Sequence, residues 1–197
     1  WIEIGFPAVS PLRPASRSMR SAWIEMTLTY LQRIKAFLER EVCGDYQLKA
    51  WHPDDADRFE LVAPSVHTGW EPVEIGGSGL EGKVPGIVVG ISGPIVDDGE
   101  KRLIPVCLSL IVCAAGSVLP GKGITPDRTG YYDLLNLGDR VVYAVRNAVE
   151  VGEGMVLDEP RIEFEPDNES MGDLWLGLVS FTLRAAPGPR AACRDLI

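Results

Sequence analysis

The chain has 197 residues, of which 46% are hydrophobic and 24% are charged. This balance is typical of a globular protein and excludes a mainly disordered one, and the length suits one well-packed domain better than two. Nineteen Lys and Arg against 28 Asp and Glu leave a formal charge of -9, which excludes the basic surface of a dedicated nucleic-acid binder.

The four cysteines are scattered and form no Cys-x-x-Cys pair, and no histidine stands at metal-ligand spacing from them. They are Cys43, Cys107, Cys113 and Cys193. We therefore expect reduced core thiols, made in a cytoplasm. No apolar run reaches the length of a membrane span, and the first residues lack the apolar core of a signal peptide. We expect neither a membrane protein nor a secreted one.

Residues 1–25 are expected to form an extended arm or linker, because Pro7, Pro11 and Pro14 and several serines interrupt regular structure there. The arm is either a solvated linker or a clasp on a neighbouring subunit. Residues 26–186 are the expected single domain, and residues 187–197 are a C-terminal tail.

A first amphipathic helix is predicted from Thr27, with Thr27 or Thr29 as its capping residue, to the stop at Gly44. Its apolar residues recur at helical spacing and are Leu28, Leu31, Ile34, Leu38 and Val42. Short strands follow at residues 47–51 and 59–63, either as a hairpin or as edge strands. The run 87–91 has the pattern of a buried strand.

The next predicted feature is a β-hairpin with an acidic tip. Asp97, Asp98, Gly99 and Glu100 supply turn chemistry before a long strand over residues 103–115. Gly130–Val149 is predicted as the second helix, in which Leu135, Val142 and Val149 widen the apolar face beyond what one sheet needs.

A half-exposed strand is expected at residues 161–165 and a last strand at residues 174–185, in which Trp175, Val179, Phe181 and Leu183 share one face. Two helices packed on a largely antiparallel β-sheet, with a β-hairpin extension, make an α+β domain.

Two glycine-rich segments, Gly77–Lys83 and Gly116–Lys122, match part of a phosphate-binding P-loop. Val84 and Gly123 stand where the Ser or Thr that holds Mg²⁺ is required, and nearby prolines oppose a helix that begins at the lysine. Residues 155–159 resemble a Walker B run, so a P-loop-like nucleotide-binding enzyme is kept as the less favoured alternative.

The histidines indicate no chemical site. His52 precedes Asp54, Asp55 and Asp57, but the spacing of a calcium loop is missing, and a solvated acidic turn is the better interpretation. His67 has no recognised nucleophile setting. We predict no catalytic residue, no cofactor and no metal site.

The order of strand, helix and strand over residues 101–115, 130–149 and 174–185 resembles the tail terminator proteins of long-tailed bacteriophages. The resemblance lies in the helix opening Gly-x-x-Asp-Leu-Leu-Asn-Leu at residues 130–137, in the long strand before it, and in an ending of acidic loop, Trp-x-Gly and β-strand. It covers roughly residues 26–186.

What the resemblance implies is a structural virion protein and not an enzyme. It would form a ring, expected to be a hexamer, that caps the head-proximal end of the tail tube, stops its polymerisation and joins it to the head. The expected partners are further copies of the chain, the tail tube protein, a head-completion or connector protein, and genomic DNA that passes through the lumen without specific binding. The expected location is the tail neck of the virion, after assembly in the host cytoplasm.

Within such a ring, Asp97, Asp98 and Glu100 are the candidate loop that faces the lumen or the tube. The candidate subunit-interface residues are Trp23, Trp70, Leu135, Val142 and Val149. Another neck or head-completion component, or a part of a phage-derived contractile machine, is the alternative.

Overall fold

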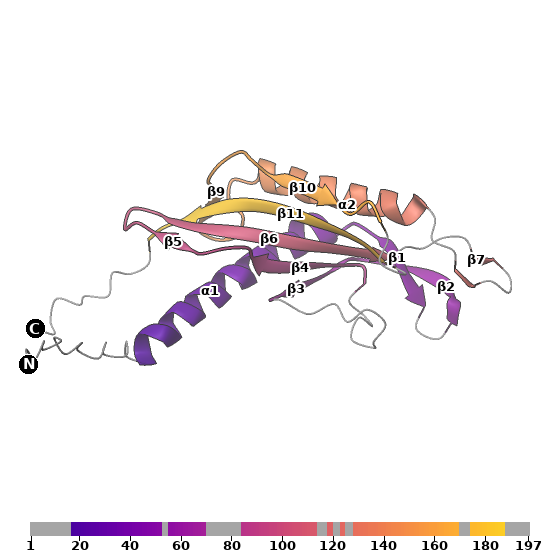
Figure 1. The fold of residues 1–197 in the computed structure, drawn as a ribbon, viewed down its shortest axis with the longest axis horizontal. Coiled ribbons are helices and arrows are strands. Elements are labelled where there is room, and N and C mark those ends of the chain that lie inside the picture. Colours follow the sequence, from indigo (N-terminus) through magenta and orange to yellow (C-terminus); the bar gives the residue numbers. More distant parts are fainter. Residues whose placement is uncertain are drawn as a thin grey trace, which may run out of the picture.

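A mostly antiparallel β-sheet with two helices packed on it forms the body of the molecule (Figure 1). The structure is a computed structural model that describes residues 17–52, 55–69, 84–113, 118–119, 123–124, 128–169 and 174–187. Its elements are α1 (Arg17–Leu38), the π-helical turn η1 (Glu39–Cys43), β1 (Leu48–His52), β2 (Asp55–Val62), β3 (Ser65–Thr68), β4 (Gly86–Ile91), β5 (Val96–Asp97), β6 (Arg102–Cys113), β7 (Val118–Leu119), β8 (Gly123–Ile124), α2 (Arg128–Asn147), β9 (Met155–Leu157), β10 (Glu163–Pro166) and β11 (Leu174–Ala185). The predicted α+β class is confirmed.

The longest pair of strands, β6 and β11, lies at the centre of the main sheet. They are antiparallel and pair from Leu174 opposite Cys113 to Ala185 opposite Arg102. The strand order is β10-β11-β6-β4-β3, with β5 beside β6 and β9 beside β11. Among the described strands, β3 and β4 are the one parallel pair.

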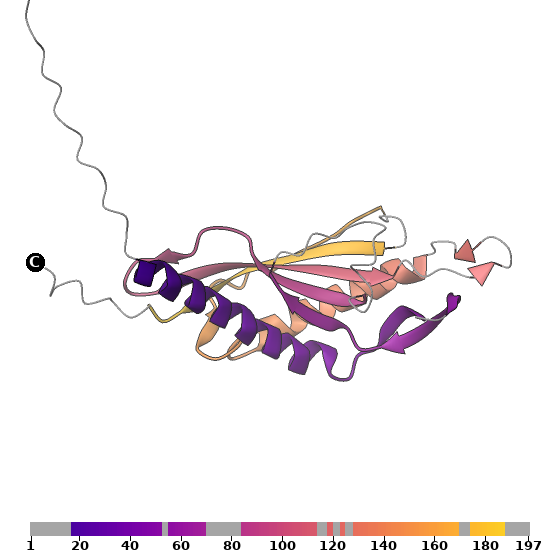
Figure 2. The ribbon, with the colours of Figure 1, turned by 90° about the horizontal axis from the view of Figure 1, so that it is seen from below.

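Both helices cover the same face of this sheet (Figure 2). The strand period of two sends alternate residues of β6 and β11 to that face. The central strands contribute Ile104, Val106, Leu108, Leu110, Val179, Phe181 and Leu183 to the core, and the helices contribute Leu31, Ile34, Leu38, Leu134, Leu137, Val141 and Val145. The predicted shared face of the last strand is confirmed, and Trp175 packs half-buried against the same core.

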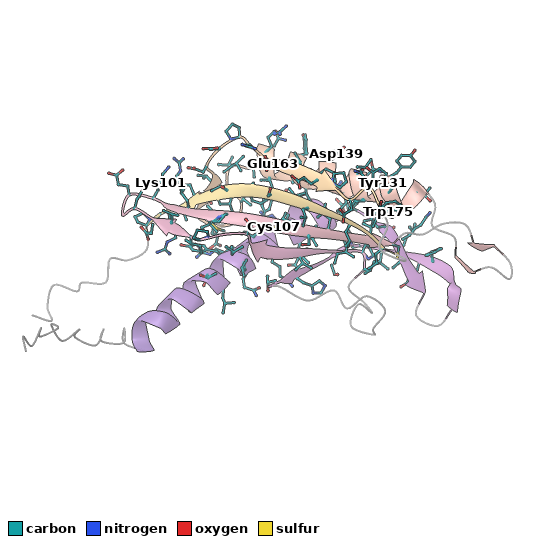
Figure 3. The ribbon with its side chains drawn as sticks, viewed as in Figure 1. Lys101, Cys107, Tyr131, Asp139, Glu163 and Trp175 are labelled. Atoms are coloured by element: carbon teal, nitrogen blue, oxygen red, sulfur yellow. The ribbon has the colours of Figure 1, made fainter. Side chains whose placement is uncertain are left out.

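The opposite face of the sheet is only partly covered by the residues that the structure describes. A small cluster at one end joins Val84, Ile111, Cys113 and Leu174. Beyond it the outward side chains of β6 are half-buried and Leu178 of β11 is 46% exposed. Cys107 belongs to this outward row near the middle of the sheet (Figure 3).

The first helix is longer than the sequence predicted. It begins at Arg17 and not at Thr27, so the expectation that residues 17–25 lack regular structure is wrong. After Pro14 the sequence holds no further proline before Pro53, and Met19, Trp23 and Met26 continue the helical spacing of the core residues. The division of the chain into arm, domain and tail stays a prediction.

Most of the other predicted elements agree with the structure within a few residues. The second helix ends at Asn147, so Val149 lies beyond it, and the short strands β3, β5, β7, β8 and β9 were not predicted. The acidic turn before β6 lies where it was predicted, but the strand directly across it is β5, and the strand predicted to form the hairpin is β4, which pairs with β6 farther along. The bounds of the last strand are as predicted. No described helix is both long and apolar enough to span a membrane.

Candidate assembly surfaces

The acidic hairpin is held by its own carboxylates. Oδ1 of Asp98 accepts hydrogen bonds from the backbone N–H groups of Glu100 and Lys101, both at 2.9 Å. These two bonds, first that from Lys101, lower the pKa of Asp98. Gly99 has a φ of 84°, which a residue with a side chain rarely adopts. Asp98 is therefore a turn-forming residue as well as a surface charge.

Asp97 makes the second structural contact of the hairpin. Its Oδ2 accepts hydrogen bonds from Nη2 and Nε of Arg102, at 2.7 and 3.1 Å. Arg102 is only 2% exposed and also donates to the hydroxyl of Tyr30 at 3.1 Å. Asp98 thus holds the turn and Asp97 ties the hairpin to the buried Arg102, while Glu100 is an exposed carboxylate on the same turn.

Arg102 is a residue that the sequence reasoning missed. The alternation of side chains along a strand could have indicated it. Arg102 lies an even number of residues before Ile104, Val106 and Leu108, which face the core, so its side chain is expected on the same face. A charged residue on the buried parity of a strand needs a partner of opposite charge. Asp97 is that partner, across the hairpin in register with Arg102.

The five predicted interface residues do not form one patch among the described side chains. Leu135 is half-buried on α2, and Val142 packs half-buried against the core. Val149, beyond the end of α2, is 90% exposed. Trp23 lies within helix α1, where the structure describes the backbone, and Trp70 lies outside the described residues.

A groove runs along the outer flank of α1, between that helix and the segment after α2. It consists of two adjoining hollows of about 460 and 530 Å³ that share Phe37, Arg40 and Glu150. Leu28 and Ala36 lie along one wall, and Val149 and Tyr143, which is 72% exposed, lie on the other side. We call this surface the α1 groove. Val149, one of the predicted interface residues, therefore lies on a groove of mixed apolar and charged lining.

The arginines of the α1 groove are held by contacts within the chain. Arg40 pairs with Glu41 at 2.7 Å, and Nη1 of Arg33 donates to the carbonyl of Glu153 at 2.9 Å. Nε of Arg140 donates to the carbonyl of Val42 at 2.7 Å. Glu150 and Glu153 are exposed on the rim. Glu153 lies 4.0 Å from Arg33, and Glu150 accepts a hydrogen bond from the backbone N–H of Gly154 at 3.2 Å.

The ring of Phe164 packs against two glycines, of which Gly177 belongs to the motif behind the resemblance. A Cβ on Gly138 would lie 2.2 Å from Cζ of Phe164, and a Cβ on Gly177 would lie 3.1 Å from Cε2 of the same ring. Gly138 comes from α2 and Gly177 from β11. Because neither has a side chain, the two glycines leave room for Phe164 of β10 to pack against the core. Leu134 also contacts the Gly177 position, at 3.2 Å. The motif has a packing role here.

Trp175 closes the other end of this unit. Its ring lies 5.1 Å from that of Tyr131, at an interplanar angle of 59° (Figure 3). Tilted aromatic pairs at this distance are favourable beyond the area that they bury. The start of α2 is thereby held to the start of β11.

The described part of the second P-loop-like segment forms a β-ribbon. In the second segment, Val118–Leu119 and Gly123–Ile124 pair as the ribbon β7–β8, and α2 begins only at Arg128. No helix start follows Lys122 to receive a phosphate. The Walker B-like run contains the edge strand β9, and its Asp158 lies 3.7 Å from Lys101 and 3.8 Å from Arg184. The first segment, Gly77–Lys83, is outside the described residues.

His67 does have a serine neighbour, which the sequence analysis did not expect. Nε2 of His67 lies 2.9 Å from Oγ of Ser65, two residues earlier on the edge strand β3. The Ser65 hydroxyl also donates to the carbonyl of Pro85 at 3.4 Å. While that bond is made, His67 donates to Ser65, which is the reverse of a base that activates a nucleophile.

No group of three or more metal-ligating side chains occurs within the described residues. The side chains of His52, Asp54, Asp55 and Asp57 lie outside what the structure describes. No protein-family model matches the chain, and no curated protein matches it as a relative.

Proposed function

We propose that this protein is a structural component of a phage tail, a tail terminator that forms a homo-oligomeric ring, expected to be a hexamer, at the head-proximal end of the tail tube. The observation that carries the proposal is the packed unit of β6, α2 and β11. Among the residues that carry the resemblance, Leu134, Trp175 and Gly177 lie at its contacts. Their role is to pack, and this supports a structural protein over an enzyme.

Two surface properties support assembly into a ring. Among the described residues, Val149 in the α1 groove and Leu178 on the second face of the sheet are exposed apolar side chains, and exposed apolar surface is available for contacts between subunits. The net charge of -9 suits a lumen through which DNA slides without binding.

The first experiment is to measure the mass of the purified protein by light scattering and to image the same sample by negative stain. We expect a ring with a central hole, in solution or after addition of the tail tube protein, and shorter tubes when the protein is added during tube polymerisation. A monomer that neither binds the tube nor limits its length contradicts the proposal.

The lumen or tube-facing role of the hairpin is tested at Glu100, because its side chain is exposed and its loss leaves the turn contacts of Asp97 and Asp98 in place. We expect Glu100→Lys to fold and assemble normally but to reduce tube capping or DNA passage. Unchanged assembly and infectivity would remove this role for the hairpin while leaving the ring untouched.

A further inference from the structure

The main sheet ends on each side in a short strand that is paired along one side only. The strand β10 lies at one edge beside β11, and β3 lies at the opposite edge beside β4 (Figure 1). Within the described residues no strand pairs with the outer side of either one. The backbone N–H and C=O groups on such an edge are available for pairing with another chain.

The outer edge of β10 is formed by the backbone of Phe164 and Pro166. The N–H of Asp167 donates to the carbonyl of Leu176 on β11, at 2.9 Å. Residues that bond to the neighbouring strand alternate with residues that do not, so Glu165 is also directed to β11, whereas Phe164 and Pro166 are directed outward. Phe164 offers an N–H and a C=O there. Pro166 offers only a C=O, because proline has no backbone N–H.

The outer edge of β3 is formed by the backbone of Val66 and Thr68. The N–H groups of Ser65 and Gly69 donate to carbonyls of the segment 85–89, which includes the start of β4, and both bonds are 3.0 Å long. The residues between them therefore direct their backbone groups away from β4. Each edge thus presents two outward-directed residues.

The two edges have matching faces and opposite strand directions. Phe164 packs against the main core and Val66 is part of it, so on both edges the outward-directed residues have their side chains on the helix-covered face. Strands β10, β11, β6 and β4 are successively antiparallel, and β3 is parallel to β4. A second copy placed beside the first in the same orientation would therefore pair its β3 antiparallel to β10, with the helices of both copies on one side.

The two edge strands also lie at the same height in the sheet. Register partners lead from Phe164 through β11, β6 and β4 to Thr68. The pairs that stand level in this way are Phe164 and Thr68, Glu165 and His67, and Pro166 and Val66. When a second copy lies beside the first without a shift along the strands, these residues come opposite one another.

This register satisfies the backbone groups on both edges. Phe164 and Thr68 of the next copy exchange two N–H to C=O bonds, and the N–H of Val66 donates to the carbonyl of Pro166. The carbonyl of Val66 then faces a proline, which has no N–H to donate. Nζ of Lys35 in the same chain already donates to that carbonyl, at 2.8 Å. The lysine therefore supplies the donor that Pro166 lacks.

The side chains on the second face favour unlike edges over like ones. Glu165 comes opposite His67 of the next copy and Glu163 comes opposite Gly69, so no two acidic residues face each other. A symmetric contact centred on two β10 strands would place glutamate opposite glutamate, and like charges directly opposite are destabilising. The charges thus favour a contact between β10 and β3.

We propose that the outer edge of β10 in one copy pairs antiparallel with the outer edge of β3 in the next, so that the main sheet continues from subunit to subunit. This inference rests on the proposed ring and specifies the contact between its subunits. Strand addition of this kind gains affinity from main-chain hydrogen bonds. Because the two edges are different surfaces, repeating the contact is heterologous and generates a ring when the rotation closes.

The first test removes one outward N–H. Thr68→Pro deletes the N–H that points away from β4 and leaves the bonds of Ser65 and Gly69 to the neighbouring segment in place. We expect it to weaken self-association at least tenfold, as measured by sedimentation velocity and negative stain. Thr68→Ala is the matched control, because it loses the same hydroxyl, which accepts from Gln32 at 3.4 Å, but keeps the N–H. Circular dichroism and thermal unfolding show whether each variant folds.

A disulfide experiment tests the register. Glu165→Cys and His67→Cys are made in separate chains in which Cys107 and Cys193 are replaced by Ser. In the proposed register these positions form a pair without mutual hydrogen bonds, whose Cα atoms are about 4.5 Å apart, within the range of a disulfide. Within one chain they are four strand spacings apart, about 19 Å, so the bond forms only between chains.

Mixing the two cysteine variants under oxidising conditions should give a two-chain band on a non-reducing gel. A chain with both substitutions should give a ladder that ends at the ring size. Glu163→Cys mixed with His67→Cys is the matched control, because residue 163 lies on the same strand and face but two residues out of register. It should cross-link at least tenfold more slowly.

The outcomes separate this contact from the ring itself. A ring that persists in Thr68→Pro, or one whose subunits form no cross-link between positions 165 and 67, overturns the contact and leaves the proposed function standing. Equal weakening by Thr68→Ala assigns the loss to the side chain and also overturns it. A ladder that stops at two chains indicates a symmetric dimer and overturns the head-to-tail pairing. A wild-type chain that forms no ring, alone or with the tail tube, overturns both proposals.

Discussion

The guanidinium of Arg102 donates two hydrogen bonds to a single carboxylate oxygen of Asp97, its partner across the hairpin, at 2.7 and 3.1 Å. The Arg102 side chain is 3% exposed and that of Asp97 is 20% exposed. A guanidinium at this depth is tolerated because it is paired. The pair also joins two regions far apart in the sequence, since Arg102 donates to Tyr30 of α1.

Removal of Asp97 should therefore destabilise the fold. We expect Asp97→Ala to lower the free energy of unfolding by about 3 kcal/mol, because Arg102 would remain buried without its counter-charge. Urea denaturation followed by circular dichroism measures this. Glu100→Ala on the same hairpin is the control and should change stability by less than about 0.5 kcal/mol. Equal effects of the two substitutions would contradict a structural role for the pair.

Gly138 should be intolerant of even one added methyl group. A Cβ there would lie 2.2, 2.3 and 2.6 Å from atoms of the Phe164 ring, closer than any packing contact. We expect Gly138→Ala to cost about 1–3 kcal/mol through overpacking, although alanine is the better helix former. Thermal unfolding of the variant is the measurement.

The partner ring supplies a test of this mechanism. In the double variant Gly138→Ala, Phe164→Ala the added methyl has room. The loss of stability of the double variant should therefore be smaller than the sum of the losses of the two single variants, by at least about 0.5 kcal/mol. Gly93→Ala is a suitable control, because its Cβ would be 3.5 Å from Pro105, an ordinary contact. Strictly additive costs would show that the ring does not limit residue 138.

Apolar residues that recur every two or every 3.6 positions were sufficient to predict the main strands and helices. The last strand was predicted to its ends because Trp175, Val179 and Phe181 alternate with polar residues and prolines follow. The helix α2 was predicted from its apolar stripe, but its end was placed late. Val149 continues the apolar spacing although the helix stops at Asn147.

The spacing of apolar residues could not predict which distant segments pair with each other. The strand β3 is only Ser65–Thr68 and becomes a strand because it lies parallel to β4, a partner that no local pattern reveals. The Arg102–Asp97 pair and the seat of Phe164 between Gly138 and Gly177 are likewise contacts between elements. The α1 groove is lined by residues of α1 and of the segment after α2. The sequence therefore indicated Val149 as an interface residue but did not predict the groove around it.

The thiols of Cys43 and Cys107 should react slowly in the native protein. Burial, with a smaller contribution from Glu39, raises the pKa of Cys43 to about 11, and burial also raises the pKa of Cys107. The thiolate is the reactive form, so at pH 8 only about 0.1% of Cys43 is reactive. In a Cys193→Ser variant, we expect labelling by a thiol reagent at pH 8 to be at least tenfold faster in urea than in buffer.

The raised pKa of Cys43 also sets the direction in which stability changes with pH above neutral. An unfolded thiol loses its proton near pH 8.5, while native Cys43 keeps it to about pH 11. The native state then binds more protons, so the free energy of unfolding should fall as pH rises between these values. Cys43→Ala should weaken this fall, and an unaltered slope would contradict it.

The loss of stability as pH falls into the acid range should depend on Asp98. The backbone N–H groups of Lys101 and Glu100 favour its charged form and lower its pKa. Its contribution is therefore present above the unfolded pKa, about 3.9, and is lost as pH falls through the lower folded pKa. Asp98→Asn keeps a side-chain oxygen as acceptor but cannot titrate.

We expect the stability difference between wild type and Asp98→Asn to be largest near pH 6 and to shrink toward pH 2, as measured by urea denaturation across this range. Glu100→Gln, whose side chain is exposed on the same turn, should follow the wild-type curve. A difference between wild type and Asp98→Asn that stays constant with pH would show that the charge of Asp98 contributes nothing to the turn.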